Sequence, residues 1–341
     1  MRRASLVLAT ILAVGCGGGS SGPSATAACT SRATASCALR DSCSSGHGVA
    51  ARYGDPASCV SREAQACESN LRAPGTHVTP ATVAACATGL PGQACADFWN
   101  NVPIPACLPP AGARANGQPC GAPGQCQSTY CALPKGAACG LCADLPAAGA
   151  PCVNTGETVR GFTCARTTGT WAPLGASGSA CNDDSPCGAG FACVGAAGSA
   201  TTCEAQPTAT GAACDARRTS AADCDRTLGV FCTGHTGGVC APITYVGGGA
   251  ACGRLDQGDG GAGGADGGAG AFTVAACTAG ALCVLEAGVL RGACVAPAAE
   301  GAACDTDLGP PCLAPARCVG SVSDGGTTTG TCQLIDPASC G

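Results

Sequence analysis

Residues 178–203, GSACNDDSPCGAGFACVGAAGSATTC, hold four cysteines in a spacing that returns until the chain ends. A Gly-x-x-Cys tetrapeptide opens each copy, at Gly178, Gly211, Gly249 and Gly301. The cysteines of the four copies are Cys181, Cys187, Cys193, Cys203, Cys214, Cys224, Cys232, Cys240, Cys252, Cys277, Cys283, Cys294, Cys304, Cys312, Cys318 and Cys332. This pattern predicts a tandem of small units in which these cysteines form the disulfide framework. The pairing within a unit stays open, since four cysteines allow three connectivities.

The composition explains why such units need sulfur. The chain has 341 residues and 33 cysteines, while Leu, Ile, Val and Phe make up roughly 14% of it, under the ~20% typical of chains that bury a core. Each disulfide typically contributes about 2–4 kcal/mol, mainly by restricting the unfolded chain. The sequence therefore predicts a small disulfide-rich fold.

Spacing within the repeats separates a fixed segment from a tolerant one. Between the second and third cysteines lie 5, 7, 5 and 5 residues, whereas the gap from the first to the second is 5, 9, 24 and 7. We expect a fixed hairpin or turn in the former and a loop in the latter, because lengthening a loop costs only about 0.6 kcal/mol per doubling. A large apolar side chain, such as Phe191, Phe231 or Leu282, precedes the third cysteine and should pack on the disulfides.

The N-terminus has the composition of an export signal. Residues 1–15, MRRASLVLATILAVG, join two arginines to an apolar run too short to span a bilayer. The run ends at Ala13-Val14-Gly15-Cys16, which resembles the lipobox of bacterial lipoproteins and implies acylation of Cys16. The alternative is an ordinary cleaved signal with Cys16 as a chance residue. Setting Cys16 aside leaves 32 cysteines, an even number that can pair fully.

Two further regions precede the repeats. Residues 16–28 hold the lipidated cysteine and a Gly/Ser tether, and residues 29–107 predict a helical, cysteine-rich domain. Asp55-Pro56 and Thr79-Pro80 each predict a helix start with an N-cap and a first-turn proline. Aromatic residues 53, 98 and 99 are expected in the core of this domain. Residues 108–119 form a Pro/Gly linker.

The remainder, residues 120–341, is predicted to be a tandem of cysteine-rich repeats, each a disulfide-stapled loop or hairpin. Units lie near 120–142, 152–164, 181–203, 214–240, 252–294 and 304–332, and a flexible insert, 255–271, interrupts one of them. The unit at 152–164 lacks two cysteines. We expect an elongated array, with the insert as the first site of proteolysis.

Two resemblances add to this interpretation. Cysteines 120, 126, 131, 139 and 142 have a spacing that resembles the N-terminal cysteine-rich region of Dickkopf-type proteins, which implies a stapled fold. The whole layout of lipobox, helical cysteine domain and Gly-x-x-Cys repeats resembles the myxobacterial cysteine-rich lipoproteins.

No catalytic residue, metal site or cofactor is predicted. Cys139-Gly-Leu-Cys142 has the spacing of a redox or zinc motif, but neither flank is a strand or a helix, so we predict structural disulfides there. The histidines, His47, His77 and His235, are scattered without a supporting motif.

Charge and architecture together favour a non-enzymatic role. Removing Arg2 and Arg3 leaves 15 basic against 22 acidic residues, a net charge of −7, so nucleic acid is not an expected partner. We predict an exported lipoprotein, anchored to the membrane by its acyl group and facing the periplasm or cell surface, that is structural or binds a protein or envelope partner. The alternative is a protease inhibitor or toxin-like protein. Binding is expected in loops between third and fourth cysteines, such as 194–202 and 319–331.

Overall fold

The computed structural model describes residues 22–196, 200–234, 237–256, 272–286, 290–323 and 327–341. The predicted signal at 1–15, Cys16 and most of the predicted insert, residues 257–271, lie outside the described residues. Within the described ranges, no helix is both long and apolar enough to cross a membrane.

The first region is helical, as predicted. Its α-helices are α1 (Ala25–Ser42), α2 (Gly48–Tyr53), α3 (Pro56–Arg72), α4 (Pro80–Gly89) and α5 (Cys95–Trp99). Short 3-10 turns are η1 (Leu90–Gly92), η2 (Pro105–Cys107), η3 (Pro123–Gln125), η4 (Arg226–Leu228) and η5 (Pro337–Cys340). Both predicted helix starts are confirmed: the Asp55 carboxylate accepts a hydrogen bond from the Ser58 amide, and Thr79 forms a capping box with Thr82.

Disulfides join helices α1 and α3 side by side. Cys29 of α1 bonds to Cys67 of α3, and Cys37 of α1 bonds to Cys59 of α3. On each helix the two cysteines are eight residues apart, and the earlier cysteine of α1 bonds to the later cysteine of α3. This pairing makes the helices antiparallel, and a spacing of eight keeps both sulfurs on one face. Tyr53 is 3% exposed beside the Cys37–Cys59 disulfide, whereas Phe98 and Trp99 are half-buried against a neighbouring cluster.

Helix α1 begins inside the segment expected to be a tether. The Ser24 hydroxyl accepts a hydrogen bond from the Ala27 amide at 3.2 Å and so caps the helix. The predicted tether at 16–28 is therefore too long at its C-terminal end. The run Ala25-Thr-Ala-Ala that follows Ser24 is compatible with a helix, and its small residues let α1 pack closely, as Ala28 does at 2% exposure.

Short strands make up the repeats. The strands are β1 (Pro119–Cys120), β2 (Cys131–Ala132), β3 (Gly140–Cys142), β4 (Thr158–Val159), β5 (Phe162–Cys164), β6 (Trp171–Pro173), β7 (Phe191–Val194), β8 (Thr202–Ala205), β9 (Ala213–Cys214), β10 (Val230–Cys232), β11 (Gly238–Pro242), β12 (Thr244–Val246), β13 (Ala251–Asp256), β14 (Phe272–Cys277), β15 (Leu282–Leu285), β16 (Arg291–Val295), β17 (Ala303–Asp305), β18 (Arg317–Val322) and β19 (Thr328–Gln333). The sheet orders are β1-β3-β2, β4-β5-β6, β7-β8, β10-β11-β9, β12-β14-β13-β16-β15 and β17-β19-β18. All pairs are antiparallel except β12 with β14.

The units share one arrangement of strands. The strand carrying the fourth cysteine lies between the strands that carry the first and the third, as β11 lies between β9 and β10. In the 181–203 unit the segment of the first cysteine contributes only a single bridge, between Ala180 and Thr202. The third cysteine stands opposite the fourth in every four-cysteine unit, for example Cys193 opposite Cys203. The predicted repeat is thus a real structural repeat, with its hairpin between the third and fourth cysteines.

The glycine of each Gly-x-x-Cys tetrapeptide has a backbone role. Gly178 and Gly211 have φ of +76° and +83°, a region that side chains disfavour. A Cβ at either position would meet nothing within 4 Å, so conformation and not space demands glycine. The amide of each donates to the carbonyl of the fourth cysteine of its unit, Cys203 or Cys240, at 2.8 Å.

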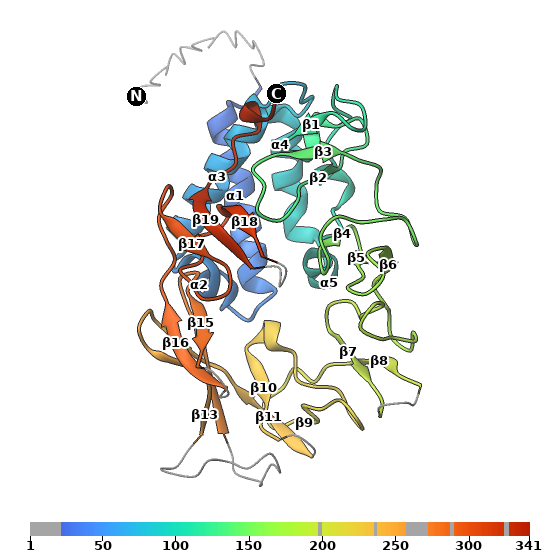
Figure 1. Ribbon diagram of the computed structural model, residues 1–341, viewed down its shortest axis with the longest axis vertical. Coiled ribbons are helices and arrows are strands. Elements are labelled where there is room, and N and C mark those ends of the chain that lie inside the picture. Colours follow the sequence, from blue (N-terminus) through green and yellow to red (C-terminus); the bar gives the residue numbers. More distant parts are fainter. Residues whose placement is uncertain (1–21, 197–199, 235–236, 257–271, 287–289, 324–326) are drawn as a thin grey trace, which may run out of the picture.

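The repeats do not form the elongated array expected from the sequence. Figure 1 shows the chain running from β1–β3 beside α4, past β4–β8, across β9–β11 and back along β13–β19 to the C-terminus near β1. A disulfide between Cys139 and Cys340 joins the first unit to the last residues, across 201 positions of sequence. The Arg317 guanidinium also donates to the Pro134 carbonyl at 3.2 Å. The repeats therefore form a closed ring around the helices.

Most units contact the helices through one segment, which we call the docking turn: the few residues just before the third cysteine. The contacts are Gly161 N to Asn100 O at 3.0 Å, Ala189 N to Asn100 Oδ1 at 2.8 Å, Gly229 against the His47 ring, Ala279 N to Ala50 O at 2.8 Å, and Arg62 Nε to Ala314 O at 2.6 Å. A segment that must reach the helices and return to its sheet has a restricted length. This explains the nearly constant gap between the second and third cysteines.

The expected linker at 108–119 is packed along the first unit. The Gly112 amide donates to the Cys126 carbonyl and the Arg114 amide to the Gln125 carbonyl, both at 2.8 Å. The Gln125 side chain, fully buried, donates in turn to the Pro74 carbonyl at 3.0 Å. Residues 112–114 are thus the joint between the helices and the ring.

Candidate functional site

The disulfide framework has a single rule in the repeats: the first cysteine bonds to the third and the second to the fourth. The predicted framework cysteines pair as Cys181–Cys193, Cys187–Cys203, Cys214–Cys232, Cys224–Cys240, Cys252–Cys283, Cys277–Cys294, Cys304–Cys318 and Cys312–Cys332. In the first unit Cys120–Cys131 and Cys126–Cys142 follow the same rule. Every cysteine in the described part of the chain is paired.

The Cys139-Gly-Leu-Cys142 motif forms structural disulfides, as predicted. Its two cysteines do not bond to each other, because Cys139 pairs with Cys340 and Cys142 with Cys126. Triplets of cysteine sulfurs elsewhere, such as those of Cys214, Cys224 and Cys232, lie within 4.8 Å of one another. These sulfurs are close because two disulfides stack in each unit, so their lone pairs are not those of free thiolate ligands.

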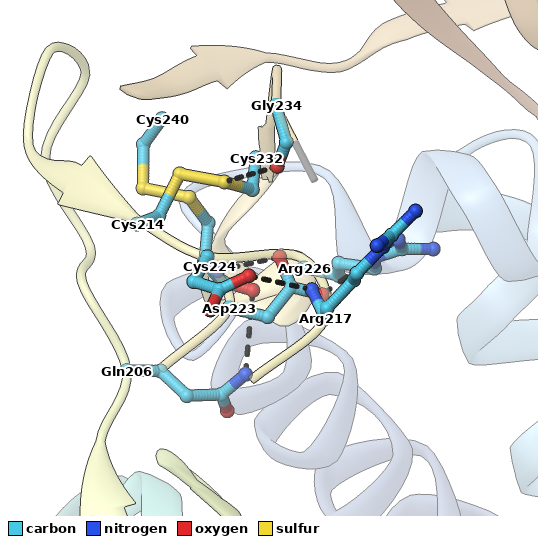
Figure 2. A network of polar contacts seen from close by, with 10 residues as sticks. Gln206, Cys214, Arg217, Asp223, Cys224, Arg226, Cys232, Gly234 and Cys240 are labelled. Carbon is cyan, nitrogen blue, oxygen red and sulfur yellow. Dashed lines mark hydrogen bonds and ion pairs between the residues drawn. A yellow bond between two sulfur atoms is a disulfide. The ribbon is translucent and has the colours of Figure 1, made fainter. Parts of the chain in front are cut away.

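Figure 2 shows the two disulfides of the 214–240 unit with the polar contacts beside them. The disulfides Cys214–Cys232 and Cys224–Cys240 lie against each other, and Cys224 is 0% exposed. Polar contacts surround them: Gln206 donates to the Cys224 carbonyl at 3.3 Å, and the Asp223 carboxylate accepts from the Cys224 amide at 2.8 Å. Disulfides and hydrogen bonds thus supplement a small apolar core, in which Val230 packs on the sulfurs.

A carboxylate or amide directly after the first cysteine organises the loop that follows. Asp215 is 1% exposed and accepts hydrogen bonds from Arg217, Thr219 and Ser220. Burial by itself raises the pKa of Asp215, but the hydrogen bonds from Thr219, Ser220 and Arg217 outweigh it and bring the pKa to about 2. Asn182 and Asp305 accept amides of their loops in the same way. The Cys-Asx dipeptide signals this role in the sequence.

The two loops predicted to bind a partner are hairpins with different surroundings. Residues 194–202 lie in the β7-β8 hairpin, and residues 319–331 in the β18-β19 hairpin. The second is held by the first unit, because the Gly320 amide donates to the Gly136 carbonyl at 2.9 Å and Val322 contacts Gly136. The tips, 197–199 and 324–326, lie outside the described residues.

A cavity of about 510 Å³ lies between the helices and the first two units. Arg32 of α1, Arg160 and Glu157 line it together with Tyr130. Arg160 donates to the Thr129 hydroxyl at 2.8 Å, whereas the Tyr130 hydroxyl is buried and has no hydrogen-bond partner among the described residues. Burial, and then the charge of Glu157, raise the pKa of Tyr130 to about 12, so this hydroxyl is a neutral donor at physiological pH.

Burial also determines the charges around this cavity. It raises the pKa of the Glu157 carboxyl, an effect that hydrogen bonding by Asn154 and the charge of Arg317 oppose. The Arg32 side chain reaches solvent within the cavity, while the surrounding protein lowers the pKa of its guanidinium. Arginine remains protonated through the physiological range, so the cavity presents two cations beside one carboxyl group.

The histidines are not brought together among the described residues. His47 stacks on Tyr245 with 4.4 Å between ring centres, and the His77 Nδ1 atom lies 2.6 Å from the Ala111 carbonyl oxygen. His235 falls outside the described residues.

Comparison with known proteins found no matching family model, no matching curated protein and no matching solved structure.

Proposed function

We propose that this protein is an exported, lipid-anchored binding protein of the cell envelope, of the myxobacterial cysteine-rich lipoprotein kind, without enzymatic activity. The observation that carries the proposal is the division of each repeat into an inner and an outer part. Docking turns contact the helices, while the β7-β8 hairpin is joined to its own unit by two disulfides and to the next unit by the Gly195 amide, which donates to the Arg218 carbonyl at 2.8 Å. Loops that vary on a rigid framework are where binding residues concentrate.

Export is supported by the disulfides themselves. Sixteen disulfides require an oxidising compartment, such as the periplasm or the cell exterior. A Cys16→Ser variant is expected to lose acyl labelling and to move from the membrane to the soluble fraction. The oxidised protein should carry no titratable thiol beyond Cys16 under denaturing conditions. Membrane retention of the variant would mean that another feature holds the protein there, and two or more further thiols would contradict complete pairing.

Binding is tested on the β7-β8 hairpin. Replacing residues 196–200 by Asn-Gly shortens this hairpin, keeps Gly195 and Thr201, whose backbone groups bond Arg218 and Cys181, and leaves Cys193 and Cys203 opposite each other. We expect capture of envelope material by the oxidised full chain to fall at least about tenfold, which corresponds to about 1.4 kcal/mol. The matched control replaces residues 323–327 of the β18-β19 hairpin by Asn-Gly, which keeps the buried Thr328 paired with Val322, and the first unit already covers this hairpin.

The alternative of a protease inhibitor gives a different outcome in the same experiment. An inhibitor places one rigid loop in a protease cleft. The unaltered chain would then inhibit at least one protease of a panel, and shortening a single hairpin would abolish that inhibition. Equal capture of envelope material by all variants would refute binding through the hairpins.

A further inference from the structure

A second cavity, of about 300 Å³, lies where helices α1 and α2 face the 214–240 unit and strand β12. Three arginines line it, Arg40 of α1, Arg52 of α2 and Arg226 of η4. No aspartate or glutamate is among the described residues that line it. In a chain with net charge −5, this cavity is strongly cationic.

Arg40 is held rigidly at the wall of the cavity. Its guanidinium carbon lies 5.2 Å from the ring centre of Phe98 and 5.4 Å from that of Trp99. Burial first, and then the positive charge of Arg52, lower the pKa of Arg40, while Tyr53 and Glu63 oppose this shift. Two like charges therefore face each other here, and an anion between them would relieve their repulsion.

The nearby carboxylates are engaged outside the cavity. Glu63 accepts a hydrogen bond from the Tyr53 hydroxyl, and Asp223 binds the Cys224 amide while lying 3.8 Å from Arg226. Asp223 is buried, whereas the Arg226 side chain is 65% exposed, and at 3.8 Å the two groups form no direct hydrogen bond, so the Arg226 guanidinium stays open to a second anion. Among the described residues, the guanidinium groups of these three arginines donate one hydrogen bond, from Arg52 Nε to the Tyr53 hydroxyl at 3.2 Å, so their other N–H groups can bind a ligand.

His47 and Tyr245 form the opposite wall as a stacked pair, 18° from parallel. Gly229 makes this possible, because a Cβ at that position would lie 2.8 Å from the His47 ring. Neither the His47 ring nitrogens nor the Tyr245 hydroxyl have a hydrogen-bond partner in the part of the chain that the structure describes. The site therefore offers polar donors and flat apolar surfaces together.

We propose that this cavity binds a phosphate-type dianion carried on a flat or apolar group. Each guanidinium group can donate two parallel hydrogen bonds to a pair of oxygen atoms. Three such cations suit the charge and the oxygen atoms of a phosphate dianion better than those of a single carboxylate. A wider cavity adjoins it and shares Trp99 and Thr227, and Arg217 extends to the same side as Arg226 in Figure 2. The rest of the ligand fits there. The phosphate can belong to a soluble ester or to a phosphorylated envelope glycan.

The test uses the oxidised full chain carrying Cys16→Ser, with calorimetry and tryptophan fluorescence at low salt. The chain has two tryptophans; Trp99 lines the cavity, and Trp171 is buried in the 152–164 unit. Phenyl phosphate should bind and change the fluorescence of Trp99, and Trp99→Phe should remove the optical signal. A sugar 6-phosphate is the second probe and distinguishes a glycan from an aryl ester. Benzoate is the monoanionic comparison.

Arg52→Gln and Arg226→Gln should each weaken phenyl phosphate binding at least about tenfold, since each removes a charged hydrogen bond to the phosphate. Both side chains are exposed, so folding should persist, as complete thiol pairing would verify. The matched control is Arg72→Gln, an exposed arginine of α3 paired with Glu68. Equal weakening by the control, binding of benzoate as tight as that of phenyl phosphate, or no binding of either phosphate probe would overturn the proposal. The assignment does not depend on the acyl anchor.

Discussion

The units at 181–203 and 152–164 have the same backbone arrangement but are held by different side chains. The first has two disulfides, Cys181–Cys193 and Cys187–Cys203. The second has one, Cys152–Cys164, and Trp171 occupies the place of the fourth cysteine, opposite Cys164 in the strand register. The Gly149 amide donates to the Trp171 carbonyl at 2.8 Å, as the equivalent glycine does to a fourth cysteine elsewhere.

The difference teaches that a buried aromatic can replace a disulfide in this fold. Trp171 is 3% exposed and lies edge-on to Tyr130 of the first unit, with 6.2 Å between ring centres. A disulfide such as Cys187–Cys203 lies within its own unit, whereas the tryptophan also joins its unit to a neighbour. The comparison predicts graded effects, which are best followed by hydrogen exchange, because a chain with many disulfides does not unfold in one step.

The largest expected effect is that of Trp171→Ala. Removing a buried tryptophan side chain costs about 3–5 kcal/mol through lost burial and the cavity that remains. Amide protection should fall both in β5–β6 and around Tyr130, since the two units share this contact. Trp171→Phe should retain much of the protection. Unchanged exchange in the first unit would show that the tryptophan does not couple the units.

Removing the corresponding disulfide should have a somewhat smaller and more local effect. We expect a double variant, Cys187→Ala with Cys203→Ala, to lose about 2–4 kcal/mol of local stability. Protection in β7 and β8 should fall while that in β5 and β6 persists. Cys37→Ala with Cys59→Ala is the control in the helical region, where Cys29–Cys67 still joins α1 to α3. Loss of structure throughout the ring would contradict independent units.

Asp215→Asn tests the polar loop of a two-disulfide unit. The variant should cost about 1–3 kcal/mol, because it weakens charged hydrogen bonds to the loop of residues 217–220. The pKa of Asp215, about 2, lies below the value of roughly 3.9 expected in the unfolded chain. The stability that the ionised Asp215 carboxylate contributes is therefore complete above the unfolded-state pKa of roughly 3.9. It is lost as the pH falls through the folded-state pKa of about 2. Hydrogen exchange of the loop between pH 5 and 2 should show this loss in the parent only.

The smallest expected effect is that of Gly178→Ala. The backbone there has φ of +76°, so alanine costs about 1 kcal/mol even though its Cβ meets no atom within 4 Å. Gly92→Ala is the control, since its Cβ would also be unobstructed and its backbone is not left-handed. Equal stability of both variants would show that the Gly-x-x-Cys glycine is not required by conformation.

Local spacing determined much of this molecule. The four-cysteine repeat, the two capped helices at Pro56 and Pro80, and the structural role of Cys139 and Cys142 all follow from sequence patterns, because caps and disulfides within a unit involve nearby residues. Disulfides inside the repeat units span 11 to 31 positions. The start of α1 at Ala25 was missed, since a Gly/Ser-rich stretch masks the Ser24 cap.

Tertiary structure alone decided the ring and its cavities. Nothing in the spacing of the repeats indicates that the chain closes through Cys139 and Cys340, because a partner 201 residues away is not marked by any local pattern. The arginines at 40, 52 and 226 are far apart in the sequence, so the sequence does not predict that they form a basic patch. They meet because docking turns bring the 214–240 unit against α1 and α2, and such long-range packing depends on complementary surfaces that sequence periodicity does not encode.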